Sequence, residues 1–211
     1  MKKIAAFLSF LLLLGGCAQD QPTAETIQEH FDALPGFTAH VKIISDFDES
    51  VLEYEVDYAY NRKGSDHLTL TAPESVRGIE ATIDGEERIL LRYGGAELDD
   101  GTPGLQGTTP ADGVYWVLRE LRESEPLEIW PESVSGTPAL AVRYEGTVED
   151  TEITRQVWLR QDSLQPLCAE VYSDGTRVLL LTFSDYQEGM TVQPEADGET
   201  DAVPPAEPDG A

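Results

Sequence analysis

The sequence predicts a mainly β fold of the α+β class, with about nine antiparallel strands and two helices. Short segments of alternating apolar and polar residues recur between Phe37 and Tyr186. Asp-Gly pairs at residues 84–85 and 174–175 separate some of these segments, as in hairpins. Only two segments have the apolar spacing of a helix, which is too few for a repeating βαβ pattern.

The first helix is predicted directly after a short N-terminal tether. Its apolar face consists of Ile27, Phe31 and Leu34, which follow the spacing of helical turns. Thr23 is a suitable N-cap residue, because its side-chain oxygen can accept a hydrogen bond from an N–H group of the first turn. Pro35-Gly36 ends the helix, since proline cannot continue it.

Strands follow the first helix one after another. The clearest spans residues 52–60, where leucine, valine and tyrosine alternate mainly with acidic residues. One face of this strand is therefore buried or ligand-facing, and the other faces water. Turns are predicted at residues 46–50 and 61–65. The other strands predicted in this half are residues 37–43, 67–72, 79–83 and 88–93.

A second helix interrupts the strands. Residues 94–108 are rich in glycine and aspartate and predict a loop, after which Thr109 is expected to cap a helix that has Pro110 in its first position. The apolar stripe of this helix is Val114, Val117, Leu118 and Leu121. Strands then resume at residues 139–144, 151–160, 167–173 and 177–186. Residues 178–183 are apolar on both faces apart from Thr182, which predicts an interior strand under a helical lid.

The N-terminus has the features of a bacterial lipoprotein signal. Lys2 and Lys3 precede an apolar run at residues 4–14, which suits a secretory signal but is shorter than the roughly 20 residues of a membrane-spanning helix. Leu14-Gly15-Gly16-Cys17 resembles the lipobox, in which a leucine and two small residues precede the lipidated cysteine. We therefore expect cleavage before Cys17 and a lipid anchor on this residue, which holds the chain on the outer face of the cytoplasmic membrane.

Four parts of the chain are predicted. They are a signal peptide at residues 1–16, a lipidated tether at 17–22, one domain at 23–188 and an acidic, proline-rich tail at 189–211. The tail has almost no large apolar residue, so we expect it to be disordered. Cys168 is the only cysteine besides Cys17, which leaves no pair for a disulfide in the mature chain. In its strand-like segment, Cys168 is more often a packed side chain than a nucleophile.

The chain is strongly acidic, with 14 Lys+Arg against 40 Asp+Glu. Removal of the signal takes away Lys2 and Lys3 and changes the formal net charge from −26 to −28. Such a surface repels nucleic acids and anionic lipid headgroups, so we exclude nucleic-acid binding. A basic protein partner would be attracted.

No catalytic or metal-binding pattern is recognisable in the sequence. His30, His40 and His67 lack the spacing of zinc ligands, and no Gly-x-Ser-x-Gly motif occurs. Asp46-x-Asp48-x-Ser50 begins like a calcium-binding loop, but Val51 occupies the sixth position, where the turn requires glycine. We therefore expect a protein that is not an enzyme and that uses no cofactor or metal.

The order of these elements resembles the LolA/LolB-like superfamily, from about Thr23 to Gln187. The final third carries the resemblance best. Gln156-Val157-Trp158-Leu159-Arg160, the turn Leu164-Gln165-Pro166-Leu167 and the segment Glu170–Gly175 look like the closing strands and turns of that family. Residues 83–93 look like its central hairpin.

This resemblance implies a strongly curved antiparallel half-barrel that is closed by helices over an apolar cavity. Family members carry lipoproteins or sense lipid-like ligands. The tyrosine stripe of residues 54–60 would line such a cavity and Trp116 would close it, although ordinary core packing explains the same pattern. The expected lining residues are Tyr54, Val56, Tyr58, Tyr60, Leu68, Leu70, Ile79, Ile83, Leu91 and Trp116.

The lipid anchor distinguishes this chain from the soluble carriers of the superfamily, because a tethered protein cannot carry cargo freely. It is more similar to the anchored members of Gram-positive bacteria, which include a clostridial germination lipoprotein that is the partner of a cell-wall amidase. Two functions are expected from this resemblance. The first is binding of a hydrophobic ligand or of lipoprotein acyl chains in the cavity. The alternative is a non-catalytic scaffold for an envelope or spore-cortex enzyme, with an outward-facing Trp158 as a protein contact.

Overall fold

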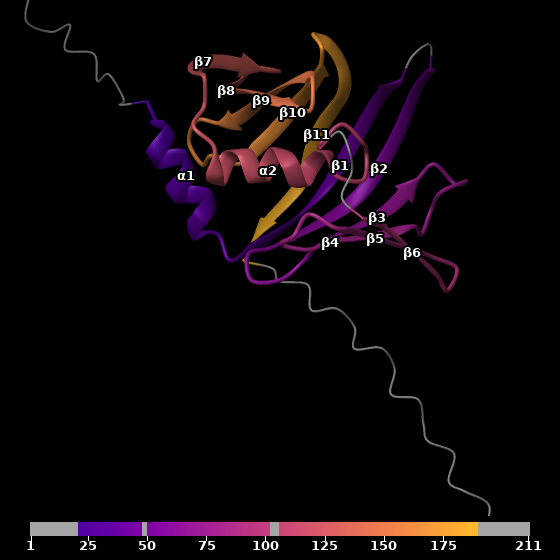
Figure 1. Ribbon diagram of the computed structural model, residues 1–211. Coiled ribbons are helices and arrows are strands. Elements are labelled where there is room, and N and C mark those ends of the chain that lie inside the picture. The colour runs from indigo at the N-terminus through magenta and orange to yellow at the C-terminus, as the bar shows by residue number, and fades with distance from the viewer. Residues whose placement is uncertain (1–20, 48–49, 102–105, 190–211) are drawn as a thin grey trace, which may run out of the picture.

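The computed structural model describes residues 21–47, 50–101 and 106–189, which form one antiparallel sheet of eleven strands and two α-helices (Figure 1). The predicted mainly β class is confirmed. Cys17, the signal peptide and nearly all of the tail lie outside the described residues. The elements are α1 (Ala24–Ala33), β1 (Gly36–Phe47), β2 (Ser50–Asn61), β3 (Asp66–Ala72), β4 (Glu80–Ile83), β5 (Ile89–Tyr93), β6 (Ala96–Gly101), α2 (Gly113–Glu123), β7 (Glu128–Val134), β8 (Thr137–Val148), β9 (Thr151–Arg160), β10 (Pro166–Ser173) and β11 (Thr176–Glu188).

The two halves of the chain meet in the middle of the sheet. β1 pairs with β2 on one side and with β11 on the other, so the strand order is β6-β5-β4-β3-β2-β1-β11-β10-β9-β8-β7. Strands β1–β6 form one wing of the sheet, and β7–β11 form the other. Figure 1 shows the sheet curving around α2, which crosses its concave side. The curved antiparallel sheet with covering helices therefore agrees with the predicted architecture.

Two strands were not predicted, and both lie at the edges of the sheet. Gly94 and Gly95 have φ values of +58° and +82°, which suit the two-residue turn of a tight hairpin. The chain therefore returns at once as β6 instead of continuing as the predicted loop. In β7, Pro131 argues against a strand, but at a sheet edge its missing N–H group is not required for pairing.

The start of α1 is predicted correctly and the start of α2 is not. The Thr23 hydroxyl accepts a hydrogen bond from the N–H group of Thr26 at 3.3 Å, so Thr23 caps α1 as expected. α2 begins at Gly113, after Asp112, rather than at Pro110. The Asp112 carboxylate accepts a hydrogen bond from the N–H group of Thr109 at 3.1 Å, which holds residues 109–112 in a separate turn.

The hydrophobic core lies between α2 and the concave face of the sheet. α2 buries the predicted stripe Val114, Val117, Leu118 and Leu121. α1 packs beside α2 and adds Ile27 and Phe31 to the same core. Neither described helix is long and apolar enough to cross a membrane.

β11 occupies the interior position that its apolar run predicts. It lies between β1 and β10, and Leu179, Leu181 and Phe183 are buried against the core. The expected cover on both faces is wrong, because Leu180 on the other face is only half-buried and Thr182 is exposed. The helices lie on the concave side only, so the convex face of this strand stays partly accessible.

Candidate functional site

The structure places the strand residues expected to line a cavity on the concave side of the sheet. Val56, Tyr58, Tyr60, Leu68 and Ile83 are buried there, and Trp116 of α2 belongs to the same buried cluster. Tyr54, Leu70 and Leu91 are partly buried and pack against the same cluster. Ile79 lies directly before β4 and is half-buried.

The inner part of this face is filled by side chains. Val56, Tyr58, Leu68 and Ile83 each expose no more than 2% of their surface. A side chain that lines a void large enough for water keeps accessible surface, so values this low mean that neighbouring atoms occupy the space. The aromatic and aliphatic side chains here therefore make up a packed core rather than the wall of an open cavity.

The same face becomes exposed toward one edge of the sheet. A row of paired residues crosses five strands, from Tyr58 through Leu68, Ala81 and Leu91 to Leu98. The first three are buried, Leu91 is half-buried and Leu98 is 60% exposed. Tyr93, on the same face as Leu91 by strand alternation, is 54% exposed. We call Leu91, Tyr93 and Leu98 the apolar edge. Here the apolar face of the sheet continues from the buried core to the surface of the molecule.

A buried polar cluster lies between this wing and the end of α2. The Tyr58 hydroxyl donates to the Asp66 carboxylate, which also accepts from the N–H group of Asn61 at 3.1 Å. Arg122 of α2 donates to the Tyr60 hydroxyl at 3.2 Å. Burial raises the pKa of Asp66 to about 6, although its hydrogen bonds favour the ionised form. Asp66 thus joins β3 to β2 by hydrogen bonds, and its charged form is attracted electrostatically to Arg122 of α2.

A second buried polar cluster holds α2 against β9. Arg155 of β9 is 4% exposed and lies 2.8 Å from a carboxylate oxygen of Glu120. Its guanidinium also donates to the carbonyl of Gln106 and lies 5.4 Å from the centroid of the Trp116 ring. Desolvation lowers the pKa of Arg155, and the carboxylates of Glu120 and Asp112 oppose that effect. One strand residue thus holds α2 and the segment that precedes it.

Gly107 lies so close to Trp116 and Arg155 of this second cluster that no side chain fits at its position. It has a φ of +77°, and a Cβ atom would lie 2.6 Å from the Trp116 Cβ and 2.8 Å from an Arg155 nitrogen. We expect Gly107→Ala to lower the free energy of unfolding by about 1–3 kcal/mol, measured by urea denaturation. Gly136→Ala is the matched control, since Gly136 has a φ of +83° with open space around it. Equal losses in the two variants would contradict the steric explanation.

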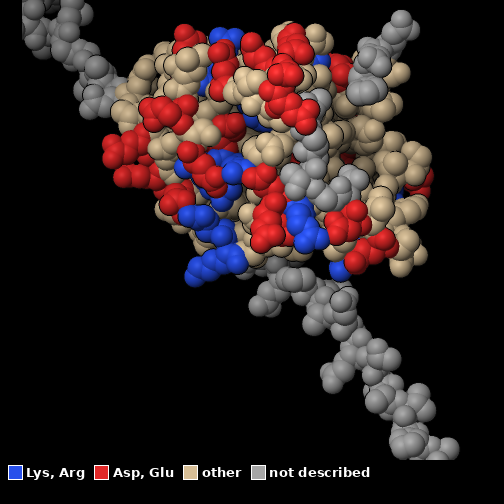
Figure 2. All heavy atoms as spheres, in the orientation of Figure 1, with Lys and Arg blue, Asp and Glu red and all other residues tan. Residues whose placement is uncertain are grey.

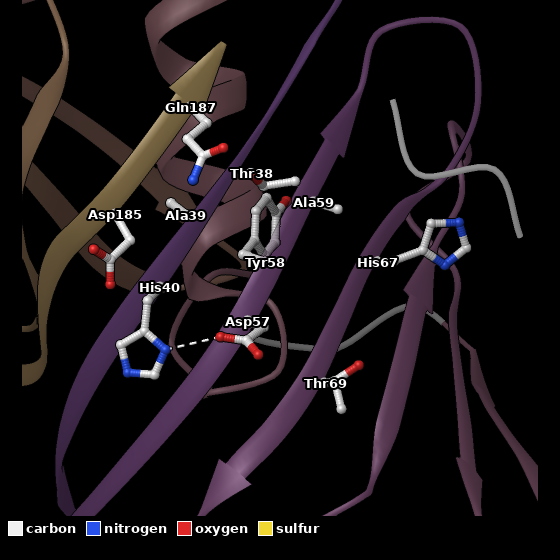
Figure 3. A pocket seen from close by; sticks show the side chains of 10 residues that line it. All are labelled: Thr38, Ala39, His40, Asp57, Tyr58, Ala59, His67, Thr69, Asp185 and Gln187. Carbon is white, nitrogen blue, oxygen red and sulfur yellow. Dashed lines mark hydrogen bonds and ion pairs between the residues drawn. The ribbon is translucent and has the colours of Figure 1, made fainter. Parts of the chain in front are cut away.

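The convex face carries a shallow hollow of about 360 Å³ across β1, β2, β3 and β11 (Figure 3). Figure 3 shows His40 and Asp57 pointing toward one another, and their Nδ1 and Oδ1 atoms are 2.8 Å apart. His67 and Asp185 lie at either side of this pair. The Asp57 side chain is 67% exposed, so water screens the pair strongly. We assign no ligand to this hollow.

The comparisons with known proteins give similarity in structure only. No family model matches the sequence, and no curated protein matches it either. A DUF1329 family protein from Desulfovibrio piger has a TM-score of 0.51 at 11% sequence identity, over 81% of this chain and 92% of that chain. The two chains share a fold.

Two further solved structures are similar at lower TM-scores. A LolA superfamily protein from Nitrosomonas europaea has a TM-score of 0.42 at 16% identity, over 78% of this chain and 93% of that one. A chain from the complex of the Clostridioides difficile CwlD amidase with the GerS lipoprotein has a TM-score of 0.38 at 15% identity, over 77% and 92%. We draw no functional conclusion from these two likenesses.

The remaining candidate residues lie apart from the apolar edge. Cys168 in β10 is half-buried, and burial raises its pKa to about 11, which disfavours a reactive thiolate. Trp158 is half-buried on the convex side, and its indole N–H group donates to Glu132 at 2.7 Å. Burial also lowers the pKa of His30. Among the described residues, no group of three or more His, Cys, Asp or Glu side chains is placed to hold a metal ion.

Sequence reasoning placed Leu91 among the residues of the concave face, but it missed the other two residues of the apolar edge, Tyr93 and Leu98, and it missed Arg155. Leu98 falls in residues 94–108, which the sequence predicts as a loop, whereas the structure places it in β6. Arg155 could have been recognised from the pattern of β9, where it takes an inward position between Ile153 and Val157. A charged residue at an inward position requires a buried partner, which only the fold identifies as Glu120.

Proposed function

We propose that this chain is a non-catalytic, lipid-anchored extracytoplasmic protein, which binds a protein partner of the cell envelope through the apolar edge. The observation that carries this proposal is the change along one face of the sheet, from a filled core to the exposed side chains of Leu98 and Tyr93. Fully burying an apolar side chain contributes about 1.5–3 kcal/mol. Covering these two side chains is therefore a substantial source of binding energy.

A protein partner fits this surface better than a small ligand. Small-molecule sites are concave and enclose most of the ligand. Here the concave part of the face is occupied by α2 and its core contacts, and the apolar part that remains accessible is at an edge. A protein covers an open edge by complementary shape, and aromatic side chains such as Tyr93 are frequent in such contacts.

A photo-crosslinking amino acid at position 98 tests this function in cells that express the chain. Leu98 is 60% exposed, and Leu127, which is 58% exposed, provides a control position before β7 at the opposite edge. We expect one discrete protein adduct from position 98 that is absent from position 127. The proposal fails if neither position gives a protein adduct, or if both give the same ones.

Binding of a hydrophobic ligand or of acyl chains is the second candidate, because the exposed side chains of the apolar edge suit lipid chains as well. Native mass spectrometry of the chain from Ala18 onward, purified from cells, separates the two. Co-purified phospholipid or acyl chains would favour this second function. A mass without ligand, repeated after incubation with lipid, would favour the protein partner.

The lipid anchor gives a direct prediction for Cys17. In a bacterial host that is fed labelled palmitate, we expect Cys17→Ser to lose the label and to leave the membrane fraction, because the acceptor thiol is gone. Cys168→Ser is the matched control and should keep both, since this half-buried cysteine belongs to β10. Retention of the label in the Cys17 variant would exclude the anchor at this position.

A further inference from the structure

The two edges of the sheet differ in how well they are protected. Open edges present unpaired N–H and C=O groups to other chains, and proteins commonly block them with charged side chains, lysine above all, or with proline. β7 carries Pro131 in its middle. β6 is the other edge strand, and its sequence, Ala96–Gly101, contains neither lysine nor proline. Among the described strands, β6 has a neighbour on one side only, namely β5.

The backbone geometry of β6 identifies the groups that face outward. Tyr93 pairs with Ala96 across the two-residue turn, so this pair closes the hairpin by hydrogen bonds. Because bonded and non-bonded pairs alternate in antiparallel ladders, the N–H and C=O groups of Glu97 point away from β5. They are placed to bond another strand.

The side chains of β6 alternate between the two faces of the sheet. Leu98 lies on the concave face as part of the apolar edge, whereas Glu97 and Asp99 lie on the convex face. The two carboxylates form ion pairs, Glu97 with Arg92 of β5 at 3.0 Å and Asp99 with Arg88, directly before β5, at 2.6 Å.

The charge around β6 remains negative despite these ion pairs. Residues 79–101 contain seven acidic residues and two basic ones, Arg88 and Arg92, which leaves a net charge of −5. Figure 2 shows acidic side chains spread over the face of the molecule in view. A strand placed beside β6 is therefore favoured by basic side chains on the convex face and by apolar ones on the concave face.

We propose that β6 accepts an extended segment of the partner protein as a twelfth strand, and that this segment has alternating basic and apolar residues. Its apolar residues cover Leu98 and Tyr93, its basic residues face Glu97 and Asp99, and its backbone bonds the outward groups of Glu97. This inference rests on the proposed function and specifies how the partner is held.

A pair of substitutions at one position tests the backbone contact. Glu97→Pro removes the outward N–H group and leaves the bonds of the β5–β6 hairpin intact. Glu97→Thr removes the same carboxylate but keeps the N–H group and suits a strand. The probe is a short fluorescein-labelled peptide of alternating lysine and valine, titrated against the chain by fluorescence anisotropy. A peptide with the same lysines and valines in two separate blocks is the control.

We expect the alternating peptide to bind more tightly than the block peptide. Glu97→Pro should weaken its binding by about tenfold, and Glu97→Thr by no more than about threefold, at physiological salt. Equal affinity of both variants, with unchanged thermal unfolding, would overturn strand addition, as would equal binding of the two peptides.

If the adduct at position 98 forms in cells and Glu97→Pro leaves it unchanged, strand addition fails while the proposed function stands. If that adduct never forms, the proposed function itself fails.

Discussion

Replacement of Arg155 by alanine is expected to lower the free energy of unfolding by about 3–5 kcal/mol, the cost of removing one partner from a buried ion pair. The side chain is 4% exposed and pairs with Glu120 at 2.8 Å, so its loss leaves a partly buried carboxylate without its cation. It also removes the hydrogen bond to the Gln106 carbonyl and the contact with Trp116. Urea denaturation followed by tryptophan fluorescence measures the change.

The matched control for Arg155 is Arg119, a neighbouring arginine on α2 that is more exposed. Its side chain is 30% exposed and pairs with Glu123 at 2.9 Å and with Glu87. Arg119→Ala should cost about 1 kcal/mol or less, as is usual for exposed ion pairs. The double variant Arg155→Met with Glu120→Gln should recover part of the loss, because it leaves no unpaired charge. Equal losses in Arg155→Ala and Arg119→Ala would contradict a buried anchor for α2.

The second large effect is a pH dependence of stability that arises from Asp66. Burial raises its pKa from 3.8 to about 6 in the folded chain. Between these two values the folded state binds more protons than the unfolded state, so stability falls as the pH rises. The contribution of protonated Asp66 is fully present below pH 3.8 and is lost by about pH 6. Its size is on the order of 3 kcal/mol.

The difference between wild type and Asp66→Asn isolates this contribution, since the amide does not titrate. We expect wild type to lose about 2 kcal/mol more than Asp66→Asn when the pH rises from 4 to 7, in urea denaturation at several pH values. Tyr58→Phe should move the transition to higher pH, because the Tyr58 hydroxyl donates to the Asp66 carboxylate and favours its ionised form. Parallel stability curves for wild type and Asp66→Asn would rule out this role for Asp66.

Local patterns in the sequence determined much of the fold. The alternation in residues 52–60 correctly predicted β2 and the buried face formed by Val56, Tyr58 and Tyr60, since successive side chains of a strand point to opposite sides; Leu52, at the start of the same pattern, is 49% exposed. Thr23 and the spacing of Ile27 and Phe31 predicted α1, because capping and helical periodicity act within a few residues. The lipobox-like Leu14–Cys17 motif is of the same local kind.

Edge strands were harder to recognise in the sequence. Pro131 in β7 and the Gly-Asp-rich segment of β6 both favour loops, and only the neighbouring strands, β8 and β5, supply their hydrogen bonds. The sequence also placed Tyr54, Val56 and Ile83 together on one face, but it could not decide between a packed core and an open cavity. That choice depends on how closely α2 approaches the sheet, which involves contacts between residues far apart in the chain.

The sequence by itself determined the class of the fold, the faces of its strands and the expectation of a lipid anchor, because these follow from short-range periodicity, turn chemistry and a contiguous motif. Only the tertiary structure decided that side chains fill the concave face, that Arg155 meets Glu120 beneath α2 and that β6 is an exposed edge. The physical reason is that burial, charge pairing and edge exposure are properties of the assembled sheet. Each depends on which distant segments become neighbours.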